Sequence, residues 1–481
     1  MRISGLLMHI TSLYTNFGIG DLGPSAYDFV DFLKKSQQTI WQILPINPTG
    51  YGDSPYQCFS TFAGNPLLIS PEKLVKTGLL NEEDLQHDFI FTQGKVDYAQ
   101  VIELKNRFLR HAHTNFLPCE NFASFKDENK GWLDDYAKFS ALKAYFGGTM
   151  WHTWEDCQVD VTEEAEYHKF LQYIFFKQFE DLKRYANENG VKIMGDIPIF
   201  VAYDSADCWA NKHLFKLDDN HMPTAVAGVP PDYFSEDGQL WGNPLYNWKA
   251  HKEQDYAWWA SRLAKAAQTF DIIRLDHFRG FESYWAIPAG AETAKEGKWL
   301  PGPGKPFFDA IKRHLGQIPL VAEDLGIITP KVKALLAKLG LPGMGVLQFA
   351  FDQKPSNTHL PHNFTNNLVV YTGTHDNDTS VGWYENLDEK TKDQFRRYFN
   401  VSGERPAWDM IRAAFLSTAN ISIIPVQDVL ELGSHHRMNT PGTSYNNWQF
   451  RLEDNQLTPL HGENLRYLSK LSNRNTNENL L

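Results

Sequence analysis

Cysteine is scarce in this chain of 481 residues, and basic residues are fewer than acidic ones. The four cysteines, Cys58, Cys119, Cys157 and Cys208, form no CxxC pair and lack the spacing of zinc ligands, so no disulfide framework or structural metal is predicted. The chain has 46 lysines and arginines against 58 aspartates and glutamates, a formal charge of −12. That balance argues against nucleic acid or an anionic membrane as a partner. We expect a neutral or small-molecule substrate, and the cysteine pattern favours a reducing cytoplasm as the compartment.

Long apolar runs are also missing, since no stretch reaches the roughly 18 residues of a membrane-spanning helix. The apolar segment 5–10 is too short for the core of a signal peptide, so the protein is expected to be soluble and not secreted. Aromatic residues, by contrast, make up 14% of the chain, with 14 tryptophans and 20 tyrosines. Their rings can stack on sugars, although most aromatic side chains pack in the core of any protein.

Three glycines, Gly18, Gly20 and Gly23, match the GxGxxG pattern of dinucleotide-binding loops. A long loop separates them from the preceding apolar segment, however, and no acidic residue follows a second strand at the expected distance. The pattern is therefore interpreted as an ordinary loop, and no dinucleotide cofactor is predicted.

Eight short apolar segments, most of them ending in polar residues, recur along the chain with helical patterns between most of them. These segments are 5–10, 39–46, 191–198, 270–276, 319–324, 345–349, 367–376 and 421–428. Eight alternating βα units predict a single TIM (β/α)8 barrel that comprises residues 1–481. In that fold the functional groups lie at the carboxyl ends of the strands.

Two stretches are longer than a barrel connection requires. Residues 61–189 show mainly helical periodicity, most clearly in an apolar stripe between 167 and 182, and predict a helical insertion. Residues 202–260 are rich in glycine, proline and aromatic residues without clear periodicity. They predict a long loop subdomain over the carboxyl-end face of the barrel.

The segment 270–280, FDIIRLDHFRG, has the pattern of a buried strand that opens into a polar site. Arg274 and Asp276 are two residues apart, and on a strand this spacing points both side chains to one face. The guanidinium would then hold the carboxylate in its ionised form, which makes Asp276 a candidate nucleophile. An ordinary ion pair at a strand end would leave the same pattern.

Glu323 and Asp376 also follow predicted strands. Retaining cleavage of a glycoside needs a nucleophile and a protonated acid about 5 to 5.5 Å apart. Glu323 follows three apolar residues, so burial should raise its pKa, while Asp324 should point the other way. His375 and Asp376 could bind sugar hydroxyls, and a third carboxylate can stabilise an oxocarbenium-like transition state. The pattern predicts a site like that of retaining glycosidases, although a solvated acid at 323 and a capping pair at 375–376 are the simpler alternatives.

The chain resembles the 4-α-glucanotransferases known as amylomaltases or disproportionating enzymes, a branch of the α-amylase clan. The resemblance rests on six segments in order within residues 5–447: LPINPTGYGDSPYQ, GDIPIFV, GQLWGNPLYNW, RLDHFRG, AEDLG and GTHDNDT. It implies Asp276 as the nucleophile, Glu323 as the acid/base and Asp376 as the transition-state stabiliser. It further implies substrate-binding roles for Ser54, Tyr56, Tyr98, Asp196, Trp241, Arg274, His375 and Asn447.

The resemblance implies an enzyme that cleaves an α-1,4-glucan, holds the donor part as an ester of Asp276, and transfers it to the 4-hydroxyl of glucose or of another glucan. The partners would be maltooligosaccharide donors and acceptors, with no metal, cofactor or protein partner. Two alternatives stay open, namely a retaining α-glucan hydrolase with water as the acceptor and a glycan-binding protein on an inactive barrel. The second is weaker because all three carboxylates stand where the chemistry needs them.

Overall fold

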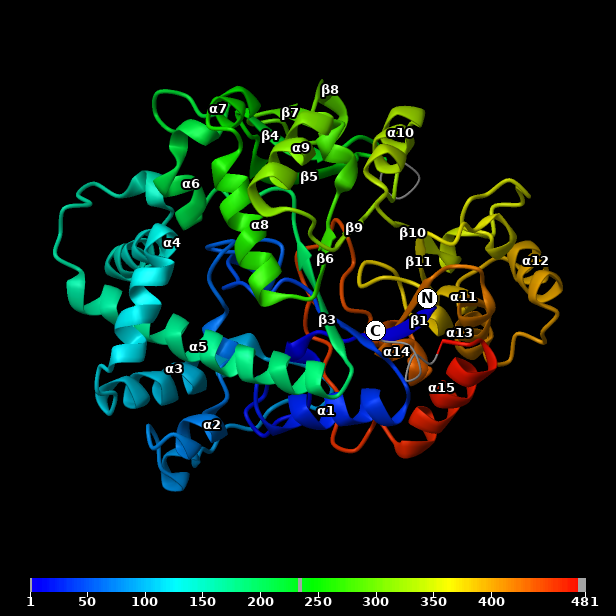
Figure 1. The fold of residues 1–481 in the computed structure, drawn as a ribbon, viewed down its shortest axis with the longest axis horizontal. Helices are drawn as coiled ribbons and strands as arrows, with labels where there is room; N and C mark the ends of the chain where they lie inside the picture. The colour runs from blue at the N-terminus through cyan, green and yellow to red at the C-terminus, as the bar shows by residue number, and fades with distance from the viewer. Residues whose placement is uncertain (1, 232–235, 475–481) are drawn as a thin grey trace.

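A parallel eight-stranded sheet forms the centre of the computed structural model, which describes residues 2–231 and 236–474 (Figure 1). The strands lie in the order β10-β11-β12-β1-β2-β3-β6-β9, and the sheet curves almost into a closed barrel, so the predicted fold class is confirmed. The strands are β1 (Ile3–Leu7), β2 (Ile40–Gln42), β3 (Lys192–Ile197), β6 (Ile272–Leu275), β9 (Leu320–Ala322), β10 (Gly343–Val346), β11 (Leu368–Tyr371) and β12 (Ile421–Pro425).

Strand β10 begins two residues before its predicted start and ends in a 3-10 turn, Leu347–Phe349. The glycines Gly343 and Gly345 weaken the strand signal in the sequence. The packing nevertheless requires them, because a Cβ atom at Gly345 would lie 2.9 Å from the Phe364 ring. Apolar periodicity therefore located β10 only in part, because close packing requires the glycines that interrupt its apolar pattern.

The first and last barrel strands are neighbours. Ile3 of β1 lies opposite Ile421 of β12, and the parallel pairing continues to Leu7 and Pro425. The helices α1 (Pro24–Lys35) and α15 (Pro459–Leu471) pack against each other outside this junction, near the two ends of the chain (Figure 1).

The chain between β2 and β3 is mainly helical, as its periodicity predicts. Its α-helices are α2 (Pro71–Lys76), α3 (Tyr98–Thr114), α4 (Glu120–Tyr145) and α5 (Thr162–Glu188), the long ones on the left of Figure 1. The predicted apolar stripe of α5 is buried, from Tyr167 to Leu182, and α4 packs along this helix. Helix α5 also contacts α1 and β3, which fixes the helical segment against the barrel wall.

A second, antiparallel sheet lies beside the barrel in the order β5-β4-β7-β8. Its strands are β4 (Ala225–Val229), β5 (Gln239–Pro244), β7 (Ser283–Pro288) and β8 (Lys298–Pro301). The expectation of an irregular loop over 202–260 was therefore wrong for β4 and β5, and α6 (Ala206–Ala210) and α7 (Trp248–Glu253) also lie in this stretch. Residues 232–235 of the predicted loop lie outside the described residues.

The remaining helices surround the barrel and connect its later strands: α8 (Ala257–Thr269), α9 (Gly304–Leu315), α10 (Pro330–Leu339), α11 (Ser380–Glu385), α12 (Glu389–Phe399), α13 (Pro406–Leu416) and α14 (Val426–Val429). Among the described residues, none of the helices combines the length and the apolar character that crossing a membrane requires.

Candidate active site

The three carboxyl groups singled out in the sequence follow three barrel strands at the same end of the barrel. Asp276 follows β6, Glu323 follows β9, and Asp376 lies in the turn after β11. Parallel strands share a direction, so these positions meet at the barrel mouth.

Arg274 binds two carboxylates at once. Its Nη1 atom donates to Oδ2 of Asp196 at 2.6 Å and to Oδ1 of Asp276 at 3.1 Å. Asp196 also accepts a hydrogen bond of 2.6 Å from the Tyr56 hydroxyl. The Arg274 side chain is only 4% exposed, whereas that of Asp276 is 27% exposed, so the nucleophile candidate is the accessible member of this network.

Burial raises the pKa of Asp276 well above its usual value, and the nearby carboxylates of Asp196 and Glu323 add to the effect. Arg274 lowers this pKa, as the sequence spacing predicted, but its shorter contact is with Asp196. The expectation that Arg274 holds Asp276 in its ionised form is therefore not met, because burial and the neighbouring carboxylates outweigh the effect of Arg274 on this pKa. The charge of Asp276 depends on the whole group of carboxylates around one buried cation.

Glu323 is 8% exposed, and both of its carboxyl oxygens accept backbone hydrogen bonds. Oε2 accepts from the N–H of His277 and Oε1 from the N–H of Leu325, each at 2.7 Å. Burial raises the pKa of Glu323, while Arg274 and these two N–H groups lower it in part. The net direction is the one that the apolar residues before Glu323 predict, and it favours a carboxyl group that can carry a proton.

Asp376 contacts His375 and is also held by two residues that the sequence analysis missed, Asn439 and Arg437. Its Oδ1 atom accepts from Nδ2 of Asn439 at 2.6 Å and lies 3.4 Å from Nε2 of His375. The guanidinium of Arg437 donates to the backbone oxygen of Asp376 at 2.5 Å. The Asp376 side chain is 47% exposed, so one face of this carboxylate is free toward the barrel mouth.

Aromatic rings line the approach to these groups. Tyr56 stacks on His375 with ring centroids 5.1 Å apart and an interplanar angle of 14°, and Trp448 lies against both rings. Trp241 meets His277, the residue after Asp276, edge to face at 4.9 Å.

Comparisons with known proteins agree on one family. The model of the 4-alpha-glucanotransferase family matches residues 8–458. The chain belongs to this family. A 4-alpha-glucanotransferase of Synechocystis is 47% identical over 98% of both chains, and that of Thermus thermophilus is 46% identical over 98% of this chain and 99% of its own. The amylomaltase of Streptococcus agalactiae, solved in complex with acarbose, superposes with a TM-score of 0.96 at 40% identity over 98% of this chain and 100% of its own.

The chain is thus an enzyme of the 4-alpha-glucanotransferase family that acts on α-glucans. Five of the substrate-binding candidates lie in the network just described: Tyr56, Asp196, Trp241, Arg274 and His375. Ser54 lies beside it and accepts the backbone N–H of Tyr56 at 3.3 Å.

The two remaining substrate-binding candidates, Tyr98 and Asn447, bond to the loop that carries Trp448. The hydroxyl of Tyr98, a residue 7% exposed, donates to the backbone oxygen of Trp448 at 2.9 Å. The side chain of Asn447 braces its own loop, since it accepts from the N–H of Thr440 and donates to the oxygen of Thr443. Tyr98 is thus buried behind Trp448, whereas Asn447 remains partly exposed.

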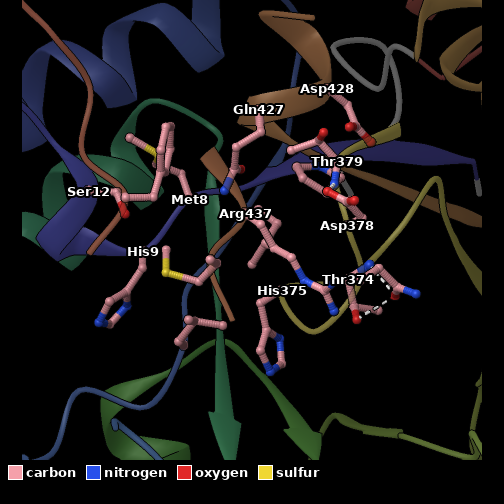
Figure 2. Close-up of a pocket in the computed structure, with 16 residues that line it drawn as sticks. Met8, His9, Ser12, Thr374, His375, Asp378, Thr379, Gln427, Asp428 and Arg437 are labelled. Carbon is pink, nitrogen blue, oxygen red and sulfur yellow. Dashed lines mark hydrogen bonds between the residues drawn. The ribbon is translucent and has the colours of Figure 1, made fainter. Parts of the chain in front are cut away.

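A small pocket opens beside His375, at the carboxyl ends of β1, β11 and β12 (Figure 2). Figure 2 shows Arg437 crossing it toward Thr374, with His9 and His375 along its lower edge. Burial, with His375 nearby, lowers the pKa of His9 to about 3, so this side chain is neutral at physiological pH. His9 and Thr374 follow strands β1 and β11, so the barrel pattern alone could have identified them, whereas Arg437 comes from a non-periodic loop.

Proposed function

We propose that this enzyme transfers α-1,4-glucan segments by a retaining double displacement, with Asp276 as the nucleophile and Glu323 as the acid/base. The observation that carries the proposal is the contrast between the two groups. Asp276 is accessible and bound to a buried cation, whereas Glu323 is nearly buried and held through both oxygens. A nucleophile needs access to the anomeric carbon, and a general acid needs a fixed position beside the leaving oxygen.

In the first step a carboxylate oxygen of Asp276 bonds to the anomeric carbon as the glycosidic bond breaks, and Glu323 gives its proton to the leaving 4-oxygen. In the second step Glu323 takes the proton of the acceptor's 4-hydroxyl, whose oxygen displaces Asp276 from the same carbon. Asp376, oriented by Asn439, would stabilise the positive charge that develops on the sugar ring. Arg274 would reduce the negative charge around Asp276 in both steps.

The donor and acceptor are inferred to be maltooligosaccharides, glucose serving as the smallest acceptor. The amylomaltase of Streptococcus agalactiae was solved with acarbose, which supports an oligosaccharide-binding cleft at this site. The rings of Tyr56, beside His375, and of Trp241, beside His277, would offer stacking surfaces to sugars, with Ser54 and Asp196 as polar contacts. We also propose the cytoplasm as the compartment, because all four cysteines are free thiols.

The proposal is tested with maltotriose as the sole sugar. We expect glucose and longer maltooligosaccharides to form while the total of reducing ends stays nearly constant. Asp276→Asn is the control and should lose more than about 99% of the activity, because a neutral amide of the same shape does not attack the anomeric carbon. A steady rise in reducing ends would instead assign the site to hydrolysis.

A further inference from the structure

One junction of the barrel differs from the others. Every other pair of neighbouring strands forms a parallel ladder, but within the described residues β9 and β10 share none. A single backbone hydrogen bond, from the N–H of Ala322 to the oxygen of Pro342 at 2.9 Å, begins the pairing. Glu323, the proposed acid/base, is the next residue after Ala322 and therefore stands where the pairing stops.

Side chains replace the missing ladder. Met344 and Val346 are two residues apart on β10, so their N–H groups point to the same edge. The N–H of Met344 donates to Oδ1 of Asp324 at 2.7 Å, and the N–H of Val346 donates to Nδ1 of His359 at 3.1 Å. These two bonds occupy N–H groups of β10 on the side toward β9.

The structure makes room for the carboxylate of Asp324. A Cβ atom at position 343 would lie 2.7 Å from both carboxylate oxygens, so only glycine admits Asp324 this close to β10. The φ angle of Gly343 is not positive, and its backbone conformation is therefore open to other residues. Gly343 is therefore required by the contact with Asp324 and not by a turn with a positive φ angle.

Asp324 adjoins Glu323, and the two side chains point to opposite sides of the extended chain, as the sequence predicted. The backbone of Glu323 is tied to the β6 side, where its N–H donates to Leu275 and its oxygen accepts from Phe278, each at 3.0 Å. On the β10 side, the hydrogen bond between Asp324 and Met344 ties this segment to β10. The chain at Glu323 is thus held on the β6 side by backbone hydrogen bonds and on the β10 side by the side chain of Asp324.

We propose that Asp324 is a positioning residue for Glu323, whose carboxylate closes the barrel between β9 and β10 and so fixes the strand end that carries the acid/base. This inference rests on the proposed role of Glu323. Burial raises the pKa of Asp324 to about 7, with Glu323 adding to the shift and Lys333 of α10 opposing it. An acceptor oxygen is present in both protonation states, so the bond to Met344 persists near neutral pH.

The test compares two donors. Turnover of maltotriose needs protonation of the leaving group, whereas the pre-steady-state burst of fluoride from a maltosyl fluoride needs little. We expect Asp324→Ala to slow maltotriose turnover roughly ten- to a hundredfold, the scale of a small misplacement of a catalytic group, with little change in KM and less than about a threefold loss in the burst rate. Asp324→Asn keeps an acceptor oxygen and should restore most of the maltotriose turnover.

Two further variants keep the inference testable. Gly343→Ala should push the carboxylate aside and reproduce the selective loss, even if Asp324→Ala fails to fold. His359→Ala is the matched control, because it removes the other side-chain bond at this junction and should lower both rates equally and by less than about threefold. If Asp324→Ala or Gly343→Ala lowers the maltotriose turnover and the fluoride burst rate in the same proportion, Asp324 is structural only and the inference fails. A transfer product with inverted configuration at the anomeric carbon would overturn the double displacement itself, which is a separate result.

Discussion

Asn439 is a residue whose importance only the folded chain reveals. It donates to Asp376 at 2.6 Å from a position 63 residues later in the chain. Its segment has no periodicity and no strand end, so nothing in its sequence surroundings pointed to the site. The pair Arg274 and Asp276, by contrast, was predictable because two residues on one strand face the same side. Local spacing thus predicted the contact between Arg274 and Asp276, whereas the contact between Asn439 and Asp376 arises only from long-range folding.

The contact between Asn439 and Asp376 leads to a prediction. Asn439→Ala frees the half-exposed Asp376 carboxylate to rotate, and we expect kcat on maltotriose to fall about tenfold with little change in KM. Asn439→Asp should be worse, since it places a second carboxylate against the first. Asn447→Ala is the comparison, because Asn447 bonds within its own loop. Loss of kcat in Asn447→Ala without loss in Asn439→Ala would reverse this assignment.

At the scale of elements, the barrel strands were predictable and the second sheet was not. Most barrel strands are short apolar runs, whereas β4 and β5 contain Gly228, Gly242 and Pro244, which resemble loop residues in a sequence. Gly228 is required because a Cβ atom there would lie 2.2 Å from the oxygen of Gln239. The partner of β4 on its other edge, β7, follows more than fifty residues later. Pairing of that kind leaves no local signal.

Helix α7 carries a buried histidine that makes stability depend on pH. His251 is 1% exposed among the rings of Tyr246, Trp248 and Trp258, and burial lowers its pKa to about 4. Between about pH 4 and 6.5 the unfolded chain binds this proton and the folded chain does not, so the folded state loses stability as pH falls through that range. The loss is at most about 3 kcal/mol for this group.

Replacing this histidine should flatten the pH profile. His251→Phe keeps a ring of similar size, so we expect a smaller drop in the unfolding temperature between pH 6.5 and 4.5 than in the wild type, with transfer activity unchanged at pH 7. Differential scanning calorimetry across this range measures the effect. An equal drop in both proteins would show that His251 does not contribute to acid sensitivity.

For the whole molecule, Arg474 links the chain ends. Its side chain is fully buried and donates to backbone oxygens of the α13 end, of the segment before β12 and of β1, among them Phe415 at 2.8 Å, Ala419 at 2.8 Å and Ile3 at 3.0 Å. A guanidinium offers five N–H donors, and the carbonyls at a helix end lack partners within the helix. One residue therefore caps α13 and fastens α15 to the first strand.

Arg474→Met should therefore destabilise the entire fold. The substitution leaves several buried carbonyls without a donor, and we expect the free energy of unfolding to fall by about 2 to 4 kcal/mol. Urea unfolding followed by tryptophan fluorescence measures the change. Arg466→Met, on the exposed face of α15, serves as the control and should stay within about 0.5 kcal/mol of the wild type. Equal losses in the two variants would contradict the role of Arg474.

The pairing of β1 with β12 also has a consequence for the nascent chain during translation. A ribosome adds roughly 5 to 20 residues per second, so β1 emerges some 20 to 80 seconds before β12 has been made. During that interval the edge of β1 that will face β12 has no strand partner, although its residues are apolar and able to pair with other chains. The barrel can close only after translation of the last strand, so β1 is the barrel strand that must be shielded longest.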